Sequence, residues 1–119
     1  MKAIYLDYQS STPVAPEVVA KMLPYFTEYY GNPHSTNHIF GQDANKAIEE
    51  SRQIIAKSIG ALAQEISFTS GATESNNLAI KGSFLYRIKY EKRNKIIVPK
   101  TEHKCVLEAS ASLEKYGAN

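Results

Sequence analysis

The sequence contains a single cysteine, Cys105, among its 119 residues. One cysteine cannot form an internal disulfide bond, and such sparse use of cysteine is typical of a protein from a reducing compartment. The apolar run near the start, Ala3–Leu6, is too short for a signal peptide or a membrane span. We therefore expect a cytoplasmic protein that does not bind membranes.

An excess of charge of one sign is also missing. The net charge is +2, and 22% of the residues are charged against 43% that are hydrophobic, as in ordinary globular proteins. The one basic cluster, Lys89–Lys95, contains Glu91 and falls at the end of an expected helix, so it indicates a solvated surface rather than a nucleic-acid site. The length allows one domain at most.

Two helices are expected in the first half of the chain. Apolar residues at helical spacing predict one helix from Pro16 to Tyr30, which Pro24 should kink or shorten, before a stop at Gly31-Asn32-Pro33. A second helix should begin near Ser35–Asn37, where all residues are good N-caps, and end at Gly60. One apolar face is expected on it, made of Phe40, Ala44, Ala47, Ile48, Ser51, Ile54, Ile55 and Ile59.

The second half alternates between short apolar segments and longer helical ones. Residues 65–69 and 96–99 read as strands, and residues 72–90 and 104–116 read as helices. This alternation predicts an α/β protein with a largely parallel sheet. We expect residues 1–34 to form an N-terminal arm and helix, and residues 35–119 to form an α/β domain.

The junction Ser70-Gly71-Ala72-Thr73 lies between an expected strand and an expected helix. Small residues there leave the first N–H groups of the helix uncovered, and these groups, with the helix dipole, favour a phosphate or another anion. A tight strand-to-helix turn without a ligand explains the same residues. Neither the GxxxxGK[ST] pattern nor the GxGxxG pattern is present, so neither a nucleoside triphosphate nor a dinucleotide is favoured.

A second candidate, His103, follows the expected strand at 96–99. Ligands of open α/β sheets bind outside the carboxyl ends of the strands, where a histidine can stack on a planar ring and exchange protons near neutral pH. A surface or capping histidine is the alternative interpretation.

Taken together, the two segments resemble the cysteine desulfurases. The stretch SGATESNNLAIKG at 70–82 resembles their phosphate-binding turn, and TEHKCVLEAS at 101–110 resembles the histidine motif that follows it. Further likenesses lie upstream, in YLDY at 5–8, STP at 11–13, GNPHS at 31–35 and HIFG at 38–41. The resemblance therefore covers essentially the whole chain.

The resemblance implies a fold-type-I enzyme that uses pyridoxal 5'-phosphate. Such enzymes convert L-cysteine to L-alanine and carry the sulfur as a cysteine persulfide, for iron–sulfur cluster assembly and other sulfur transfers. By the same resemblance Ala72 and Thr73 bind the cofactor phosphate, and His103 stacks on the ring and acts as a catalytic proton carrier. Relatives are homodimers that bind sulfur-acceptor scaffold proteins, and residues 1–13 pack on a second, smaller domain.

The resemblance also implies a partial large domain. The Schiff-base lysine, the aspartate beside the pyridinium nitrogen and the persulfide cysteine belong to family motifs that have no match in these residues. Lys104 and Cys105 do not replace them, because both fall in an expected helix. We expect a truncated and inactive desulfurase that is poorly stable alone. The alternatives are the N-terminal half of a split enzyme, completed by a second chain, and a non-catalytic module that binds a full-length desulfurase.

Overall fold

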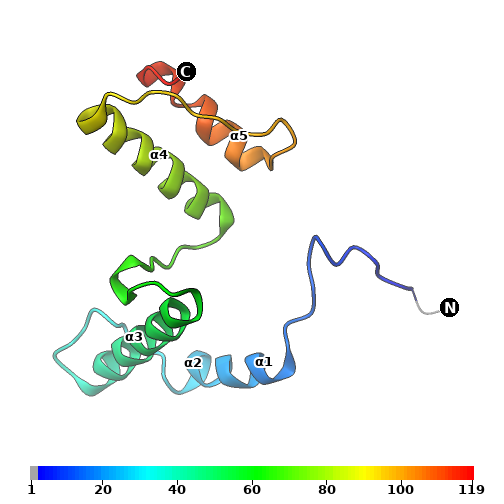
Figure 1. Cartoon of the computed structure of the whole chain (residues 1–119). Coiled ribbons are helices and arrows are strands. Elements are labelled where there is room, and N and C mark those ends of the chain that lie inside the picture. Colours follow the sequence, from blue (N-terminus) through cyan, green and yellow to red (C-terminus); the bar gives the residue numbers. More distant parts are fainter. Residues whose placement is uncertain (1–2) are drawn as a thin grey trace. The chain divides into compact units, whose positions relative to one another are not determined.

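The computed structural model describes residues 3–119 as two separate units. The first unit ends at Ile66, and the second runs from Ser67 to Asn119. Both units consist of helices and connecting segments, and no β-strand is formed among the described residues (Figure 1). The division of the chain expected near residue 34 stays a prediction.

The first unit opens with two short helices, α1 (Pro16–Met22) and α2 (Pro24–Thr27). Each begins with a proline in its first turn, where the missing N–H is not needed for helix hydrogen bonds. The predicted break at Pro24 is therefore confirmed. Neither helix buries a residue.

The long helix α3 (Ile39–Ile59) is the main element of the first unit. It begins later than predicted, because the residues before it form turns: Asn32 accepts a 2.9 Å hydrogen bond from the Ser35 amide through its backbone oxygen. The N-cap is His38, whose ring accepts a 3.2 Å hydrogen bond from the Gly41 amide. The predicted end is confirmed, since Gly60 takes the left-handed conformation with φ of 69°.

Two glycines allow the loop before α3 to lie against the start of the helix. A methyl group on Gly31 would overlap the carbonyl oxygen of Phe40, and one on Gly41 would overlap the carbonyl oxygen of Ser35. Backbone therefore packs directly on backbone here, which explains why glycine occupies both positions.

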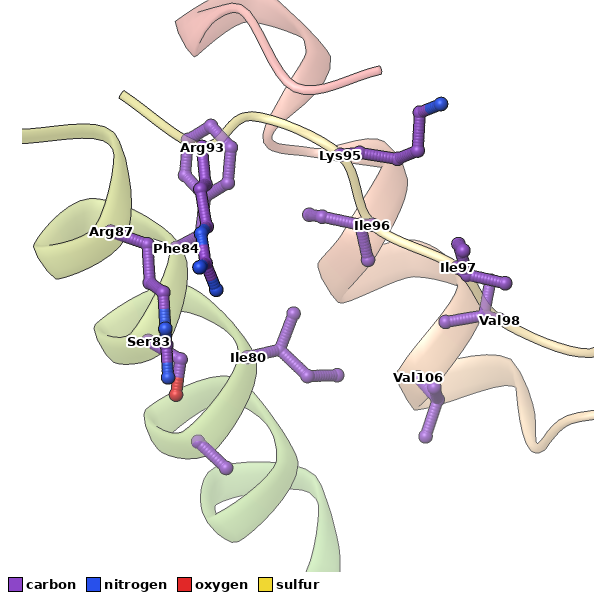
Figure 2. A pocket seen from close by; sticks show the side chains of 11 residues that line it. Ile80, Ser83, Phe84, Arg87, Arg93, Lys95, Ile96, Ile97, Val98 and Val106 are labelled. Carbon is purple, nitrogen blue, oxygen red and sulfur yellow. The ribbon is translucent and has the colours of Figure 1, made fainter. Parts of the chain in front are cut away.

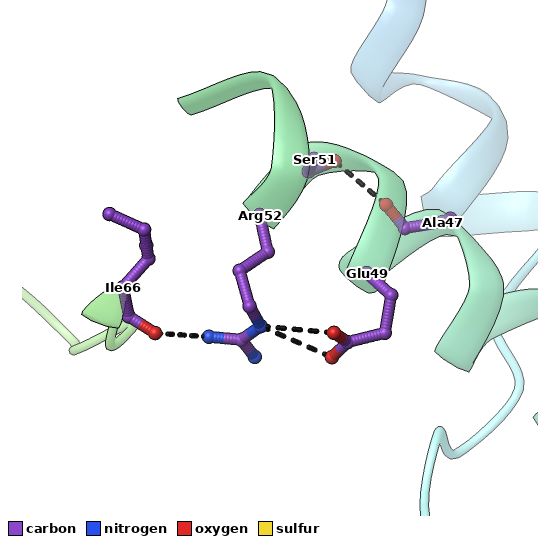
Figure 3. Close-up of polar contacts among 5 residues, drawn as sticks. All are labelled: Ala47, Glu49, Ser51, Arg52 and Ile66. Carbon is purple, nitrogen blue, oxygen red and sulfur yellow. Dashed lines mark hydrogen bonds and ion pairs between the residues drawn. The ribbon is translucent and has the colours of Figure 1, made fainter. Parts of the chain in front are cut away.

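Arg52 links α3 to the end of the first unit. Its guanidinium donates one hydrogen bond to the Ile66 carbonyl oxygen at 2.5 Å and contacts the Glu49 carboxylate at 3.1 Å (Figure 3). Between these elements lies a short 3₁₀ helix, η1 (Ala63–Glu65). Glu65, expected at the start of a strand, therefore ends a 3₁₀ turn, and Ile66 after it has an extended backbone.

The second unit is built on α4 (Ala72–Glu91) and α5 (Lys104–Ala111), which pack against each other (Figure 1). Its buried apolar residues are Phe84, Ala109 and Leu113. The helix expected over 104–116 stops earlier, and a separate 3₁₀ turn, η2 (Glu114–Tyr116), follows it.

The segment expected as a strand at 96–99 runs without helical structure and without a strand partner. Its start is anchored by two hydrogen bonds to the last residue, from the Ile96 amide to the Asn119 oxygen at 2.9 Å and from the Asn119 amide to the Asn94 oxygen at 2.8 Å. A strand exists as such only when a neighbour supplies the ladder hydrogen bonds. The structure of residues 3–119 therefore does not confirm the α/β sheet. None of the helices in this part of the chain has the length and apolar character of a membrane span.

Candidate functional site

The predicted anion-binding turn lies at the start of α4. Gly71 is the N-cap, with an extended backbone and open space around the position of a side chain, and Ala72 is the first helical residue. The first hydrogen bond of the helix runs from the Ser75 amide to the Gly71 oxygen at 3.1 Å. The N–H groups of Ala72 and Thr73 therefore have no acceptor within the helix.

A carboxylate that sequence reasoning did not single out lies at the same turn. Glu74 accepts hydrogen bonds from the hydroxyl of Ser70 at 2.6 Å and from the Ser70 amide at 2.7 Å. These two bonds lower the pKa of Glu74 below its usual range, the bond from the hydroxyl having the larger effect. An acidic residue in the first turn of a helix, after a serine, was the signal that could have found this pair.

His103 is the N-cap of α5 and is exposed. Its Nδ1 accepts a hydrogen bond from the Cys105 amide at 3.3 Å, and its own amide donates to the Glu102 carboxylate at 3.3 Å. The capping interpretation of this histidine is therefore confirmed. A capping role leaves Nε2 and the ring faces available for another partner.

One side-chain contact joins the beginnings of α4 and α5. Asn76, one turn after Thr73, donates its amide hydrogen to Cys105 Sγ at 3.0 Å, and the same sulfur lies 3.0 Å from Nδ1 of His103. The free helix end at Ala72 and Thr73 and the ring of His103 thus belong to neighbouring helix N-termini. Sequence reasoning placed Cys105 in a helix as no substitute for the persulfide cysteine, and it did not consider Asn76.

A separate cavity of about 550 Å³ lies further along α4. Its lining combines Ile80 and Phe84 of α4 with Ile96 and Val98 of the extended segment and Val106 of α5 (Figure 2). None of Ala72, Thr73 and His103 lines it. Ser83, Arg87, Arg93 and Lys95 also line the cavity, but none of them belongs to the predicted binding turn, so the cavity is not the site that the sequence predicts.

The chemistry of the turn fits a phosphate-bearing group. Free N–H groups and the positive end of the α4 dipole favour an anion, and the exposed hydroxyl of Thr73 adds a donor. Glu74 bonds to Ser70, which leaves the N–H groups of Ala72 and Thr73 to an outside acceptor. Among residues 3–119 no cluster of three or more histidine, cysteine or acidic side chains is arranged to bind a metal ion.

Comparison with known proteins places the chain in a family. Residues 4–119 match the family Aminotransferase class-V, and the chain belongs to this family.

The relatives are cysteine desulfurases. The chain is 58% identical over 114 residues to the cysteine desulfurase IscS of Rickettsia bellii and 56% identical over 114 residues to that of Rickettsia massiliae, in each case over 96% of this chain and 27% of the relative. A similar solved structure is the crystal structure of DndA from Streptomyces lividans, with 36% identity and a TM-score of 0.76 over 98% of this chain and 32% of that one. The chain thus spans about a quarter of the length of the curated relatives.

Proposed function

We propose that these residues form the opening part of a pyridoxal-phosphate-dependent cysteine desulfurase and contribute two pieces of its cofactor site. The supporting observation is the contact of Asn76 with Cys105, which connects the free helix end at Ala72 and Thr73 with His103. The assignment of a desulfurase reaction is supported by sequence identities of 56% and 58% to proteins named cysteine desulfurase.

Each residue has a defined task in this proposal. The N–H groups of Ala72 and Thr73, with the Thr73 hydroxyl, bind the phosphate. His103 stacks on the pyridine ring and carries a proton to and from the substrate at its ring nitrogen. Pyridoxal 5'-phosphate, when bound, supplies an electron sink for breaking bonds at the substrate's α-carbon. The substrate is L-cysteine, the product is L-alanine, and the sulfur passes to an enzyme cysteine and then to iron–sulfur cluster assembly in the cytoplasm.

The 119 residues do not complete this reaction by themselves, because they contain no match to the family's lysine and persulfide-cysteine motifs. An N-terminal half of a split enzyme and a module that binds a full-length desulfurase are the alternative functions. Large apolar side chains on α3 favour a role that includes a partner, since Ile54 and Ile59 are 70% and 68% exposed.

Phosphate and pyridoxal 5'-phosphate titrations of the ¹⁵N-labelled chain test the binding turn. We expect the largest amide shifts at residues 71–75, and weaker binding by Thr73→Ala. Thr27→Ala is the matched control, because Thr27 ends α2 and lies at the opposite pole of a helix dipole. Glu74→Gln should strengthen phosphate binding about two- to fivefold, since it removes a competing negative charge from the helix start. Binding that ignores Thr73→Ala and depends on a distant lysine would contradict the proposal.

An activity assay tests the proposed incompleteness. With pyridoxal 5'-phosphate, L-cysteine and a reductant, the isolated chain should release no sulfide or alanine above the level of the free cofactor. Turnover that scales with protein concentration and persists in Cys105→Ala would show that the chain is a complete enzyme.

A further inference from the structure

The only thiol of the chain is held between a side chain of α4 and a side chain of α5. Cys105 Sγ lies 3.0 Å from the amide nitrogen of Asn76 and 3.0 Å from Nδ1 of His103. Cys105 is partly buried, whereas His103 is exposed. The three side chains form one chain of polar contacts, from Asn76 through Cys105 to His103.

The directions of these hydrogen bonds follow from the groups involved. Nδ1 faces the Cys105 amide, which can only donate, so Nδ1 must present its lone pair. The thiol at 3.0 Å then donates its hydrogen to the same nitrogen, and its sulfur accepts from the Asn76 amide, which also can only donate. In the neutral ring the proton is left on Nε2.

We propose that Cys105 and Asn76 are positioning residues that hold His103 in the Nε2–H tautomer with its Nε2 directed away from α5's first turn. The transfer of the Nε2 proton to or from a cofactor-bound substrate rests on the proposed function. The tautomer of His103 does not depend on that function. Within residues 3–119 no group hydrogen-bonds to Nε2, so this nitrogen is the one that an outside partner meets.

Charged neighbours do not provide another explanation for the ring's orientation. Glu102 accepts from the backbone amide of His103, not from its ring. Lys104 forms an ion pair with Glu108 at 3.4 Å. On α4, the side chain that reaches this point is the neutral amide of Asn76.

His38 provides an internal reference, because it caps α3 in the same way without a cysteine. Its Nδ1 accepts from the Gly41 amide at 3.2 Å. If helix capping alone determined the tautomer, His103 and His38 would behave alike. With the added thiol donor, His103 should be the more strongly biased of the two.

Long-range ¹H–¹⁵N spectra of the histidine rings, recorded on the full 119-residue chain without cofactor, measure the tautomer ratio directly. We expect Nε2–H to dominate at His103. Cys105→Ala should lower the ratio of Nε2–H to Nδ1–H about fivefold, toward the ratio of His38, because it removes one hydrogen bond to Nδ1. Cys105→Ser should retain the ratio, because the hydroxyl is again a donor.

Asn76 is tested by two substitutions. Asn76→Ala should lower the ratio about twofold, since the thiol loses the donor that orients it. Asn76→Asp should lower it as much as Cys105→Ala does, because a carboxylate accepts the thiol hydrogen and draws it away from Nδ1. If Cys105→Ala also changes the signals of His38, that variant has lost structure elsewhere. The tautomer ratio of His103 in the near-isosteric Asn76→Asp variant then tests the proposal.

An unchanged His103 ratio in Cys105→Ala and Asn76→Asp would overturn the proposal and leave His103 as a simple cap. A wild-type ratio equal to that of His38 would do the same. Because these spectra are recorded without cofactor, an unchanged tautomer ratio would not contradict the phosphate binding that supports the proposed function. Conversely, a dominant Nε2–H tautomer without any phosphate binding would retain the positioning role and contradict the proposed function.

Discussion

The two units of the chain bury side chains of different size. In the first unit the buried residues are small, namely Gly41, Ala44 and Ala56, all on α3. In the second unit they include Phe84 on α4 and Leu113, which is 1% exposed. The difference follows from packing: α4 has α5 beside it, whereas within residues 3–119 α3 packs against η1 and against the loop before the helix.

An amphipathic pattern therefore determines that a helix forms, but not that its apolar face is buried. The face predicted on α3 exists as a helical stripe, yet its large aliphatic residues Ile54 and Ile59 remain exposed. Most of a helix's stability comes from packing of such a face against other elements. We accordingly expect the second unit to depend on a few large side chains and the first on backbone contacts and polar links.

The largest effect should come from Phe84→Ala. Removing a buried aromatic side chain costs about 3–5 kcal/mol, because apolar contacts are lost and a cavity is left. Phe26→Ala is the matched control, since Phe26 lies on α2 and is 71% exposed. Urea unfolding followed by circular dichroism should show a clear loss for Phe84→Ala and almost none for Phe26→Ala. Equal losses in the two variants would mean that the buried side chain of Phe84 stabilises the second unit no more than the exposed side chain of Phe26 stabilises the first.

Gly41→Ala should have the next largest effect, in the first unit. The added methyl group overlaps the Ser35 carbonyl oxygen, so the loop must move away from α3, at a cost of about 1–3 kcal/mol. Gly82→Ala, in the middle of α4, meets no atom within 4 Å and should stabilise the helix by about 0.5–1 kcal/mol. Thermal unfolding of the two variants should shift in opposite directions. Shifts of the same sign would contradict the close backbone packing at α3.

Arg52→Ala should have a smaller effect on the first unit. The change removes the hydrogen bond to the Ile66 oxygen and the contact with Glu49, and should lower the free energy of unfolding by about 1–2 kcal/mol. Lys46→Ala is the control, because the ion pair of Lys46 with Glu50 is exposed and is worth about 0–0.5 kcal/mol. Urea midpoints distinguish the two, and similar midpoints would show that the link to Ile66 is not stabilising.

The smallest expected effect is the pH dependence of the turn before α4. The hydrogen bonds from Ser70 lower the pKa of Glu74 below its ordinary value of 4.5, so the folded state favours the ionised carboxylate. The resulting stabilisation is fully present above that value and is lost as the pH falls through the lowered one. The Ser70 amide resonance should follow this titration in the wild type and should lose it in Glu74→Gln. A Ser70 amide that titrates equally in both would assign the effect to another group.

Local signals in the sequence were sufficient for the helices and for several of their ends. Pro24 breaks the first helical segment, and Gly60 ends α3, because each residue restricts the backbone by its own chemistry. The start of α3 was predicted too early, since Ser35–Asn37 are good caps locally but are used in turns that depend on the close approach at Gly31 and Gly41. Such non-local contacts leave no periodic signal.

The candidate site was predictable only in part for the same reason. Ala72, Thr73 and His103 were selected from motifs, whereas Asn76 acts through a neighbour 29 positions away, which spacing along the chain does not indicate. The expected strands depend even more on distant partners. Ile66 keeps an extended backbone without forming a ladder, because residues 3–119 supply no strand beside it.

The segment at 96–99, after α4, should differ from the helices in how fast its amide hydrogens exchange with solvent. The Ile96 amide is hydrogen-bonded to Asn119, whereas Ile97, 87% exposed, lies where the backbone has no ladder. Amide hydrogens open to water exchange with deuterium almost at the rate of an unfolded peptide, while those inside a packed helix exchange only after local opening. Deuterium uptake should therefore be nearly immediate at Ile97 and Val98 and slow around Phe84. Although its residues favour β-structure, this segment should exchange faster than the packed helix α4.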